Sequence, residues 1–323
     1  MLLIVYNQQD YIADAIAGAL AQDYPNLEIV LSDDASTDQT FAIVERCTSH
    51  YRGPHRLVIN RNPTNLGIGG NISHAVRLSS GELIFIAAGD DVSRPERVST
   101  VVRFWQQHGC RPELIASYLY DMAQDGTRGG QIQIADLSSY RSLHDWMRSP
   151  PSVIGAAQAW TRRLFDRFGG IPSGVIGEDM LMAFRAIATG GAVTLPVALV
   201  DYRRGGLTTK RTLFSANEVI HGLTRKLAST QIELSSMLAE ARQLGASPEV
   251  LADLQRRYDK ERFVESMFAA NGLLAKAGIA LRGYGQRAGF RIRIFVYAAM
   301  PWSLAPFFFV KRLLRKRRSS RNL

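Results

Sequence analysis

The chain has 323 residues and a formal net charge of +10. With 46% hydrophobic and 21% charged residues, its composition is typical of a globular protein and excludes a disordered or collagen-like chain. Its two cysteines, Cys47 and Cys110, are too few for a disulfide scaffold or a cysteine-rich zinc module, and they suit a reducing, cytosolic compartment. The segment Met1–Tyr6 has no basic residues before it, so we expect a first strand and not a signal peptide.

The positive charge is confined to the C-terminal part of the chain. After Glu265 there are twelve lysines and arginines and no acidic residue, whereas residues 1–265 carry 27 basic and 29 acidic side chains. A nucleic-acid-binding protein would spread its basic residues over its main surface. We therefore expect no nucleic-acid partner.

Through the first hundred residues, short apolar runs rich in β-branched residues alternate with helical patterns. The expected strands are 2–6, 27–31, 57–59 and 83–86, and the expected helices start near residues 12, 37, 71 and 93. The fourth helix has the clearest start signal, because Ser93 and Glu96 have the spacing of a capping box. This alternation predicts an α/β fold with a doubly wound, mostly parallel sheet.

After residue 114 the alternation loosens. We expect a strand at 114–119, a polar loop at 125–130, extended chain at 153–160, helices at 162–168 and 179–188, and extended chain at 192–202. From 213 to about 274 the pattern predicts long helices, interrupted near 245–248. The sequence thus predicts an α/β domain with a C-terminal helical extension.

Two acidic pairs each follow an expected buried strand. Asp33 and Asp34 come after residues 27–32, and Asp90 and Asp91 after residues 82–89. A single such pair in a loop is more often turn chemistry or a helix cap. Because ligands of parallel sheets bind beyond the carboxyl ends of the strands, two pairs on one rim favour a site for Mg²⁺ or Mn²⁺ that bridges to a diphosphate.

A third acidic pair, Glu178 and Asp179, begins the helix expected at 179–188. One interpretation is compensation of the helix dipole. The other is a carboxylate that faces the cleft and takes a proton from an attacking hydroxyl.

Five segments in order along residues 1 to about 205 resemble family 2 glycosyltransferases. They are Val5–Gln8 (VYNQ), Tyr24–Asp38 (YPNLEIVLSDDASTD), Asn65–Gly67 (NLG), Gly89–Asp91 (GDD) and Gly177–Asp179 (GED). The resemblance implies a fold of the nucleotide-diphospho-sugar transferase type, a nucleotide-diphospho-sugar donor, one divalent metal ion and an inverting transfer.

The resemblance also implies roles for individual residues. Asp91 would ligate the metal, Asp90 would lie near the ribose, and Asp179 would be the catalytic base. Substrate-binding roles would fall to a further set of residues: Tyr6 against the base and ribose, Asp34 or Asp33 at the nucleobase, Asn65, Glu178, and Arg203 at the diphosphate.

Three features depart from the family pattern. Ala88 stands where many members have an additional acid, and the segment Tyr202–Gly206 (YRRGG) lacks a histidine that some members use as a metal ligand. No Gln-x-x-Arg-Trp motif occurs, so we expect a non-processive transfer of a single sugar. Arg203 would then contact the diphosphate or be an ordinary surface residue.

The C-terminal segment combines an apolar run, 295–310, with the basic cluster 315–318. The run is short for a membrane span and contains two prolines. Apolar residues beside basic ones instead suit an anionic membrane surface. The alternative is a helix packed on the catalytic domain with a solvated tail. We expect a cytoplasmic protein attached peripherally to the cytoplasmic membrane face.

We therefore predict a catalytic domain at 1–212, a helical extension at 213–274 that packs on it or pairs with a second subunit, and a membrane-associating tail at 275–323. The predicted activity is transfer of one sugar to a cell-envelope or lipid-linked glycan. Two alternatives remain: a nucleotidyltransferase acting on a sugar phosphate, and a non-catalytic scaffold.

Overall fold

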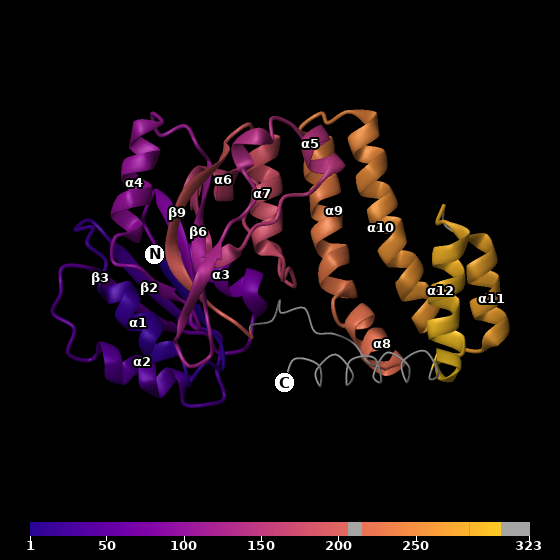
Figure 1. Cartoon of the computed structure of the whole chain (residues 1–323), viewed down its shortest axis with the longest axis horizontal. Coiled ribbons are helices and arrows are strands. Elements are labelled where there is room, and N and C mark those ends of the chain that lie inside the picture. Colours follow the sequence, from indigo (N-terminus) through magenta and orange to yellow (C-terminus); the bar gives the residue numbers. More distant parts are fainter. Residues whose placement is uncertain (206–214, 284, 305–323) are drawn as a thin grey trace, which may run out of the picture. The chain divides into compact units, whose positions relative to one another are not determined.

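The computed structural model describes residues 1–205, 215–283 and 285–304 (Figure 1). The chain forms two compact units. Unit 1 holds the described residues of Met1–Thr209 together with Ala239–Ala246, and unit 2 holds those of Lys210–Leu238 and of Ser247–Leu323.

In the described part of unit 1, nine strands form one sheet in the order β3-β2-β1-β4-β8-β6-β9-β5, with β7 paired to β6. The strands are β1 (Leu2–Val5), β2 (Glu28–Asp33), β3 (Arg56–Arg61), β4 (Leu83–Ala88), β5 (Val92–Ser93), β6 (Leu114–Met122), β7 (Arg128–Ile132), β8 (Gln158–Thr161) and β9 (Ala192–Arg203). Strands β3, β2, β1 and β4 are parallel, as are β6 and β9, whereas β8, β5 and β7 pair antiparallel. The expected mixed α/β fold with a mostly parallel sheet is confirmed.

Helices cover both faces of this sheet. Unit 1 contains α1 (Ile12–Leu20), α2 (Thr40–Thr48), α3 (Gly67–Leu78), α4 (Arg97–Gln107), α5 (Leu143–Arg148), α6 (Arg162–Arg167) and α7 (Glu178–Ala188), with short 3-10 turns at η1 (Leu137–Ser139) and η2 (Gly155–Ala157). Apolar residues of α1, α2 and α4 form one core with alternate residues of the strands, among them Leu3 and Leu31. The intervening residues, such as Leu2 and Val30, point to the other face, where α3 contacts β1 and β2.

Unit 2 is helical in its described residues. It contains α8 (Ala216–Arg225), most of α9 (Leu227–Gln243), α10 (Pro248–Ala269), α11 (Leu273–Arg282), α12 (Ala288–Ala299) and the 3-10 turn η3 (Pro301–Leu304). The last turn of α9 belongs to unit 1 through a buried ion pair, in which Arg185 Nη2 lies 2.6 Å from Glu240 Oε1. Ser247 caps α10 by accepting from the Val250 N–H, and Pro248 occupies its first turn.

Three local predictions were wrong. Ser93 does not cap α4: it lies in β5, and its Oγ accepts a hydrogen bond from Arg97 Nη1, so the helix begins only at Arg97. Residues 125–130 are not all loop, because β7 starts at Arg128 and forms a hairpin with β6. The third helix starts four residues before the predicted residue 71, at Gly67. For Ser93, pairing of β5 with the distant β9 outweighs the local capping signal.

Candidate active site

The predicted site begins where three neighbouring parallel strands end. Val5 of β1 lies opposite Asp33 of β2, and Ile4 lies opposite Ala88 of β4. The ladder continues one step further, because the Asp34 N–H donates to the Val5 carbonyl over 2.9 Å and the Gly89 N–H to the Ile4 carbonyl over 3.2 Å. Tyr6, Asp34 and Asp90, which follow these strand ends, therefore meet at the same edge of the sheet.

Asp34 is held at this edge by donors from two other segments. It is 3% exposed, and its Oδ1 accepts from Asn62 Nδ2 and from the Leu66 N–H, both over 2.8 Å. Its other oxygen, Oδ2, receives no hydrogen bond from the described part of the chain. Both hydrogen bonds go to Oδ1, so the second oxygen of Asp34 is available to a donor on a ligand.

A chain of buried amides fixes Asn62 in turn. Asn62 Nδ2 also donates to Asn71 Oδ1 over 3.0 Å, and Asn71 exchanges hydrogen bonds with Ser32 through its Oδ1 and Nδ2. Asn60 Nδ2 donates to both Ser32 Oγ and Asn62 Oδ1. The network joins β2, β3 and α3 directly beneath Asp34.

The Asp33 carboxylate binds groups of its own loop and of β3. Asp33 is fully buried, its carboxylate accepts from the Ser36 N–H and hydroxyl, and Arg61 Nε lies 3.5 Å from its Oδ2. Ala35, between them, adopts a φ of 58°. Of the first acidic pair, Asp34 rather than Asp33 therefore offers an oxygen to a ligand.

Asp90, which is partly buried, and Asp91, which is buried, form a pair of adjacent carboxyl groups. Asp91 is 5% exposed, and its Oδ1 accepts from the Arg203 N–H over 2.8 Å, while its Oδ2 receives no hydrogen bond from the described residues. Burial and the Asp90 carboxylate raise the pKa of Asp91 to about 8, and burial also raises the pKa of Asp90. The pair therefore resists ionisation until a cation compensates its charge.

Gly89 is required by the close packing around this pair. A Cβ at this position would come within 2.7 Å of Val5 Cγ1 and would collide with the Gln8 amide. The Gly-Asp-Asp motif thus combines a close approach to β1 with two carboxylates at the strand end.

Two buried arginines lie near the pair. Arg203, 4% exposed, donates from Nε to the Asp90 carbonyl and from Nη1 to the Gln124 carbonyl, and its Nη2 lies 3.1 Å from Asp14 Oδ2. It is therefore not a surface residue, and the bonds of its guanidinium in the structure are to protein groups. Arg97, 1% exposed, donates to the Ile86 carbonyl, and burial lowers its pKa to about 10.

Two further predicted substrate residues, Tyr6 and Asn65, lie at the same edge of the sheet as Asp34. Tyr6 is 45% exposed at the end of β1. Asn65 is also exposed; its Nδ2 donates to the Asp34 carbonyl over 3.3 Å, and its Oδ1 accepts from the Gly67 N–H. Gly67 has a φ of 72°, which explains the glycine of the Asn-Leu-Gly segment.

Glu178 and Asp179 occupy the first turn of α7, as predicted. Gln158 of β8 donates from Nε2 to the Asp179 carbonyl over 3.0 Å, and β8 pairs with β4. A Cβ on Gly155 of η2 would lie 2.7 Å from Glu178 Oε1, and η2 contacts β4. The start of α7 is thus tied to β4, the strand that ends two residues before Asp90.

Four residues that support the site were not predicted from the sequence: Asn62, Asn71, Gln158 and Arg97. Arg97 had a detectable signal, because it continues the i, i+4 stripe of the buried Val101 and Trp105 on α4. An arginine on an apolar stripe indicates a buried cation that needs acceptors. The amides gave no comparable signal, since asparagine is common in loops.

The described residues contain no group of three or more His, Cys, Asp or Glu side chains able to hold a metal ion. The chemistry of the pair nevertheless fits a divalent ion, because burial and the neighbouring Asp90 carboxylate raise the pKa of Asp91 even with Arg97 and Arg203 nearby, and Asp91 Oδ2 receives no hydrogen bond from the residues described. Mg²⁺ in particular is commonly held by one or two carboxylates together with substrate phosphates and waters.

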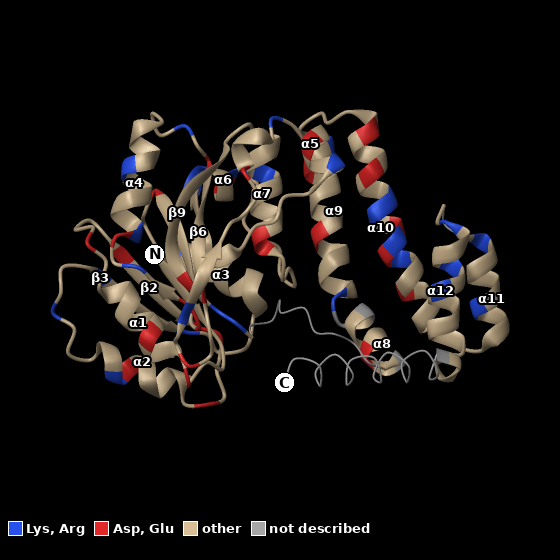
Figure 2. Cartoon of the chain, in the orientation of Figure 1, with Lys and Arg blue, Asp and Glu red and all other residues tan. Residues whose placement is uncertain are grey.

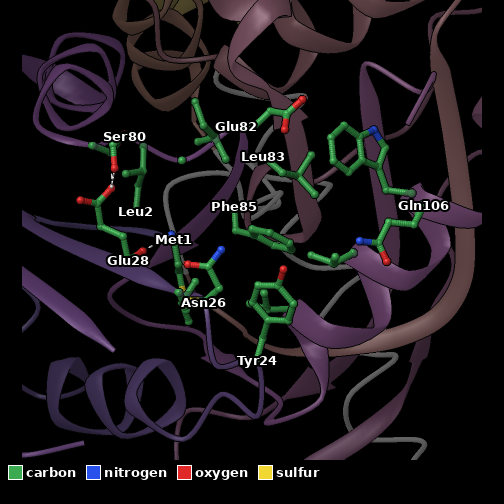
Figure 3. Close-up of a pocket in the computed structure, with 17 residues that line it drawn as sticks. Met1, Leu2, Tyr24, Asn26, Glu28, Ser80, Glu82, Leu83, Phe85 and Gln106 are labelled. Carbon is green, nitrogen blue, oxygen red and sulfur yellow. Dashed lines mark hydrogen bonds between the residues drawn. The ribbon is translucent and has the colours of Figure 1, made fainter. Parts of the chain in front are cut away.

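One cavity, of about 420 Å³, lies at the opposite edge of the sheet (Figure 3). It is lined by residues at the amino ends of β1 and β4, including Met1 and Leu83, and by Tyr24 and Trp105. Strand direction separates it from Asp34 and Asp90, so it does not belong to the predicted site. A second depression, lined by Gln124, Arg204 and three neighbours, adjoins Arg203.

The sequence matches known proteins over the part of the chain that carries these residues. The model of "Glycosyl transferase family 2" matches residues 1–168. The chain is 30% identical over 132 residues to the putative glycosyltransferase EpsE of Bacillus subtilis, and the alignment covers 41% of this chain and 46% of EpsE. It is 31% identical over 111 residues to TarS of Staphylococcus aureus, a poly(ribitol-phosphate) beta-N-acetylglucosaminyltransferase, covering 33% of this chain and 19% of TarS. The chain spans about half the length of EpsE and of other curated relatives that it matches.

Two solved structures share the fold. TarS 1-349 in complex with UDP-GlcNAc superposes with a TM-score of 0.55 at 18% identity, covering 91% of this chain and 88% of that one. The mannosyltransferase PcManGT from Pyrobaculum calidifontis, in complex with GDP-Man and Mn²⁺, gives a TM-score of 0.54 at 18% identity, covering 94% and 85%.

Proposed function

Because the chain belongs to glycosyl transferase family 2, we propose that it is an inverting, metal-dependent, non-processive glycosyltransferase. It moves one sugar from a nucleotide-diphospho-sugar to a hydroxyl of a cell-envelope or lipid-linked glycan. The observation that carries the proposal is the meeting of Tyr6, Asp34 and Asp90 at one edge of the sheet. That edge lies beyond the carboxyl ends of parallel strands, where such sheets bind ligands.

Asp34 binds the donor base in this proposal. Its free Oδ2 accepts a hydrogen bond, and the amide network beneath it keeps the carboxylate in place before the donor arrives. Tyr6, exposed beside it, lies against the base and ribose. The nucleotide-sugar complexes of TarS and PcManGT, which share the fold, support a donor of this class.

Asp91, with Asp90 beside it, holds a divalent ion in this proposal. Bound Mg²⁺ or Mn²⁺ supplies positive charge that stabilises the departing diphosphate. Arg203 keeps the pair in position because it contacts both residues: its backbone N–H donates to Asp91 Oδ1 and its Nε donates to the Asp90 carbonyl.

Asp179 is the catalytic base. An acceptor hydroxyl oxygen forms a bond to the anomeric carbon while the bond from that carbon to the diphosphate oxygen breaks. The hydroxyl proton passes to the Asp179 carboxylate, and nucleoside diphosphate leaves. A single displacement inverts the anomeric carbon and needs no second carboxylate as nucleophile.

The proposed acceptor is supported by the relatives, and the proposed location is supported by the distribution of charge. TarS, by its name, acts on a poly(ribitol-phosphate), which supports a cell-envelope polymer as acceptor. Peripheral attachment to the cytoplasmic membrane face, and pairing with a second subunit, stay predictions. The whole basic cluster 315–318 of the predicted tail lies outside the described residues. In the described helices, no stretch is both long and apolar enough to span a bilayer.

The test is product analysis with a panel of sugar nucleotides and Mn²⁺. We expect release of nucleoside diphosphate from one of them, and loss of at least ~100-fold in kcat for Asp179→Asn, because removal of a general base typically costs about 10²–10⁴-fold. The matched control is Asp166→Asn, which makes the same change at an exposed acid of α6 and should retain activity.

Two outcomes would contradict the proposal. Release of pyrophosphate from a nucleoside triphosphate and a sugar phosphate would identify a nucleotidyltransferase instead. Unchanged cellular function in both Asp91→Ala and Asp179→Asn would indicate a non-catalytic scaffold.

A further inference from the structure

The last two helices of the described chain, α11 and α12, pack through one side of each helix. We call residues 272–283 and 285–304 the basic hairpin. Ile279 and Ala280 of α11, and Phe290 and Ile294 of α12, belong to the small apolar core of unit 2, which is centred on Phe263 of α10. Lys276 Nζ also donates to the Ala298 carbonyl over 2.6 Å, which joins the two helices. The inner sides of the two helices are therefore packed against each other and against α10.

The outer sides of the same helices are also apolar. Leu274 is 89% exposed and Leu281 is 81% exposed; they are seven residues apart, so they share a side of α11 opposite to Ile279 and Ala280. On α12, Ile292 is 63% exposed and points away from Ile294. Single exposed apolar residues are ordinary, but two leucines in register on a ten-residue helix that has no buried residue are not.

The charge of the hairpin has one sign. Its charged residues are all basic: Lys276, Arg282, Arg287, Arg291 and Arg293. Figure 2 shows Lys and Arg on α11 and α12 and no Asp or Glu. Arg282 and Arg287 are exposed near the turn, and Arg293 is exposed next to Ile292. Apolar side chains flanked by arginines give the composition of a helix that lies in the plane of a membrane interface.

Charge complementarity selects one partner. A second copy of the hairpin would place like charges against each other, which opposes self-association. A nucleic acid would satisfy the arginines but leave the leucines in water. An anionic bilayer satisfies both, because its headgroups pair with arginine and its acyl region accepts leucine. We propose that the basic hairpin binds an anionic lipid surface, with Leu274 and Leu281 inserted below the headgroups.

This inference deepens the proposed function and rests on it for its purpose, which is to bring the enzyme to a membrane-borne acceptor. It assigns the contact to described helices, and the residues beyond 304 are not needed for it. The test therefore uses the full chain and a chain ending at residue 304, sedimented with vesicles of phosphatidylcholine alone or of equal parts phosphatidylcholine and phosphatidylglycerol. Both chains should bind only the anionic vesicles.

Two double variants separate the contributions. Leu274→Glu with Leu281→Glu should abolish binding, and Arg282→Glu with Arg287→Glu should weaken it by about fivefold or more for each arginine lost. Arg46→Glu with Arg52→Glu, on exposed positions of unit 1, makes the same change in net charge and should not alter binding. Emission from Trp302, which is 74% exposed, should shift to the blue with anionic vesicles, and Trp302→Phe should remove that shift.

Donor hydrolysis, measured without vesicles, should be equal in all these variants, so failure of membrane binding and failure of glycosyl transfer are separately visible. Binding that survives the leucine substitutions would overturn the proposal. Equal binding to vesicles of phosphatidylcholine alone would also overturn it, as would a loss of binding when only residues 305–323 are removed. A third contradicting result would be a protein that does not bind vesicles but forms a dimer, which the leucine substitutions convert to monomer.

Discussion

Replacement of Asp91 by asparagine should stabilise the metal-free protein while abolishing activity. Burial and the charge of Asp90 raise the pKa of Asp91 from 3.8 to about 8. Between these values the folded protein holds a proton that the unfolded chain has lost, so the free energy of unfolding falls as the pH rises through this window. The asparagine variant has no such proton to lose, and its Oδ1 can still accept from the Arg203 N–H, 2.8 Å away.

The structure sets the size of this effect. A pKa displaced by about four units corresponds to roughly 5–6 kcal/mol at about 1.4 kcal/mol per unit, which is an upper bound. Arg97 and Arg203 favour the charged form of Asp91 and lose that interaction in the variant. We therefore expect a gain of about 2–3 kcal/mol at pH 9, which decreases to about zero near pH 4.

The assay is urea unfolding of wild-type protein and Asp91→Asn, in a chelator, at several pH values. Asp38→Asn is the control outside the pair. The Asp38 carboxylate accepts from the Thr40 N–H, and although desolvation raises its pKa, its hydrogen bonds lower the pKa overall. This variant should show no gain at high pH. Added Mn²⁺ with nucleotide should stabilise the wild type and not Asp91→Asn. A difference between wild type and Asp91→Asn that does not change with pH would refute the reasoning.

Three further predictions concern the supports of the site. Asn71→Ala removes three buried hydrogen bonds and should lower the free energy of unfolding by about 2–4 kcal/mol; an unchanged urea midpoint would argue against the network. Arg185→Met should lower the free energy of unfolding by about 3–5 kcal/mol, because it leaves Glu240 unpaired, and the double variant with Glu240→Leu should recover most of this loss. A double variant no more stable than Arg185→Met would contradict this. Arg203→Ala should lower kcat/KM by about 100-fold through misplacement of the metal site. Asp14→Ala should lower kcat/KM only a few-fold, because the Asp14 side chain is 64% exposed. Initial-rate measurements that give the same loss for Arg203→Ala and Asp14→Ala would contradict this prediction.

The sequence alone identified the order of strands and helices in the first half of the chain and the position of the acidic pairs. Both are local properties, because the strands are continuous apolar runs and each pair directly follows one. The end of β2 at Asp33 and the start of α7 at Glu178 were therefore predictable to within a residue or two. Parallel strands then required the two pairs to share an edge.

Which carboxylate of each pair offers a free oxygen was decided only in the folded chain. Asp33 and Asp34 are neighbours in sequence, yet the Ser36 turn engages one, and Asn62 and Leu66 hold the other with Oδ2 open. Those partners are up to 32 residues away.

Arg203 shows the same division. The sequence placed it near the site, but its burial depends on Asp14, the Asp90 loop and Gln124, which come from three other segments of the chain. Periodicity reports which face of a helix or strand is apolar, whereas the partner of a polar atom depends on how distant segments pack. The sequence therefore determined where the acids stand along the chain, and tertiary packing determined their pKa values, their partners and the oxygens left for a ligand.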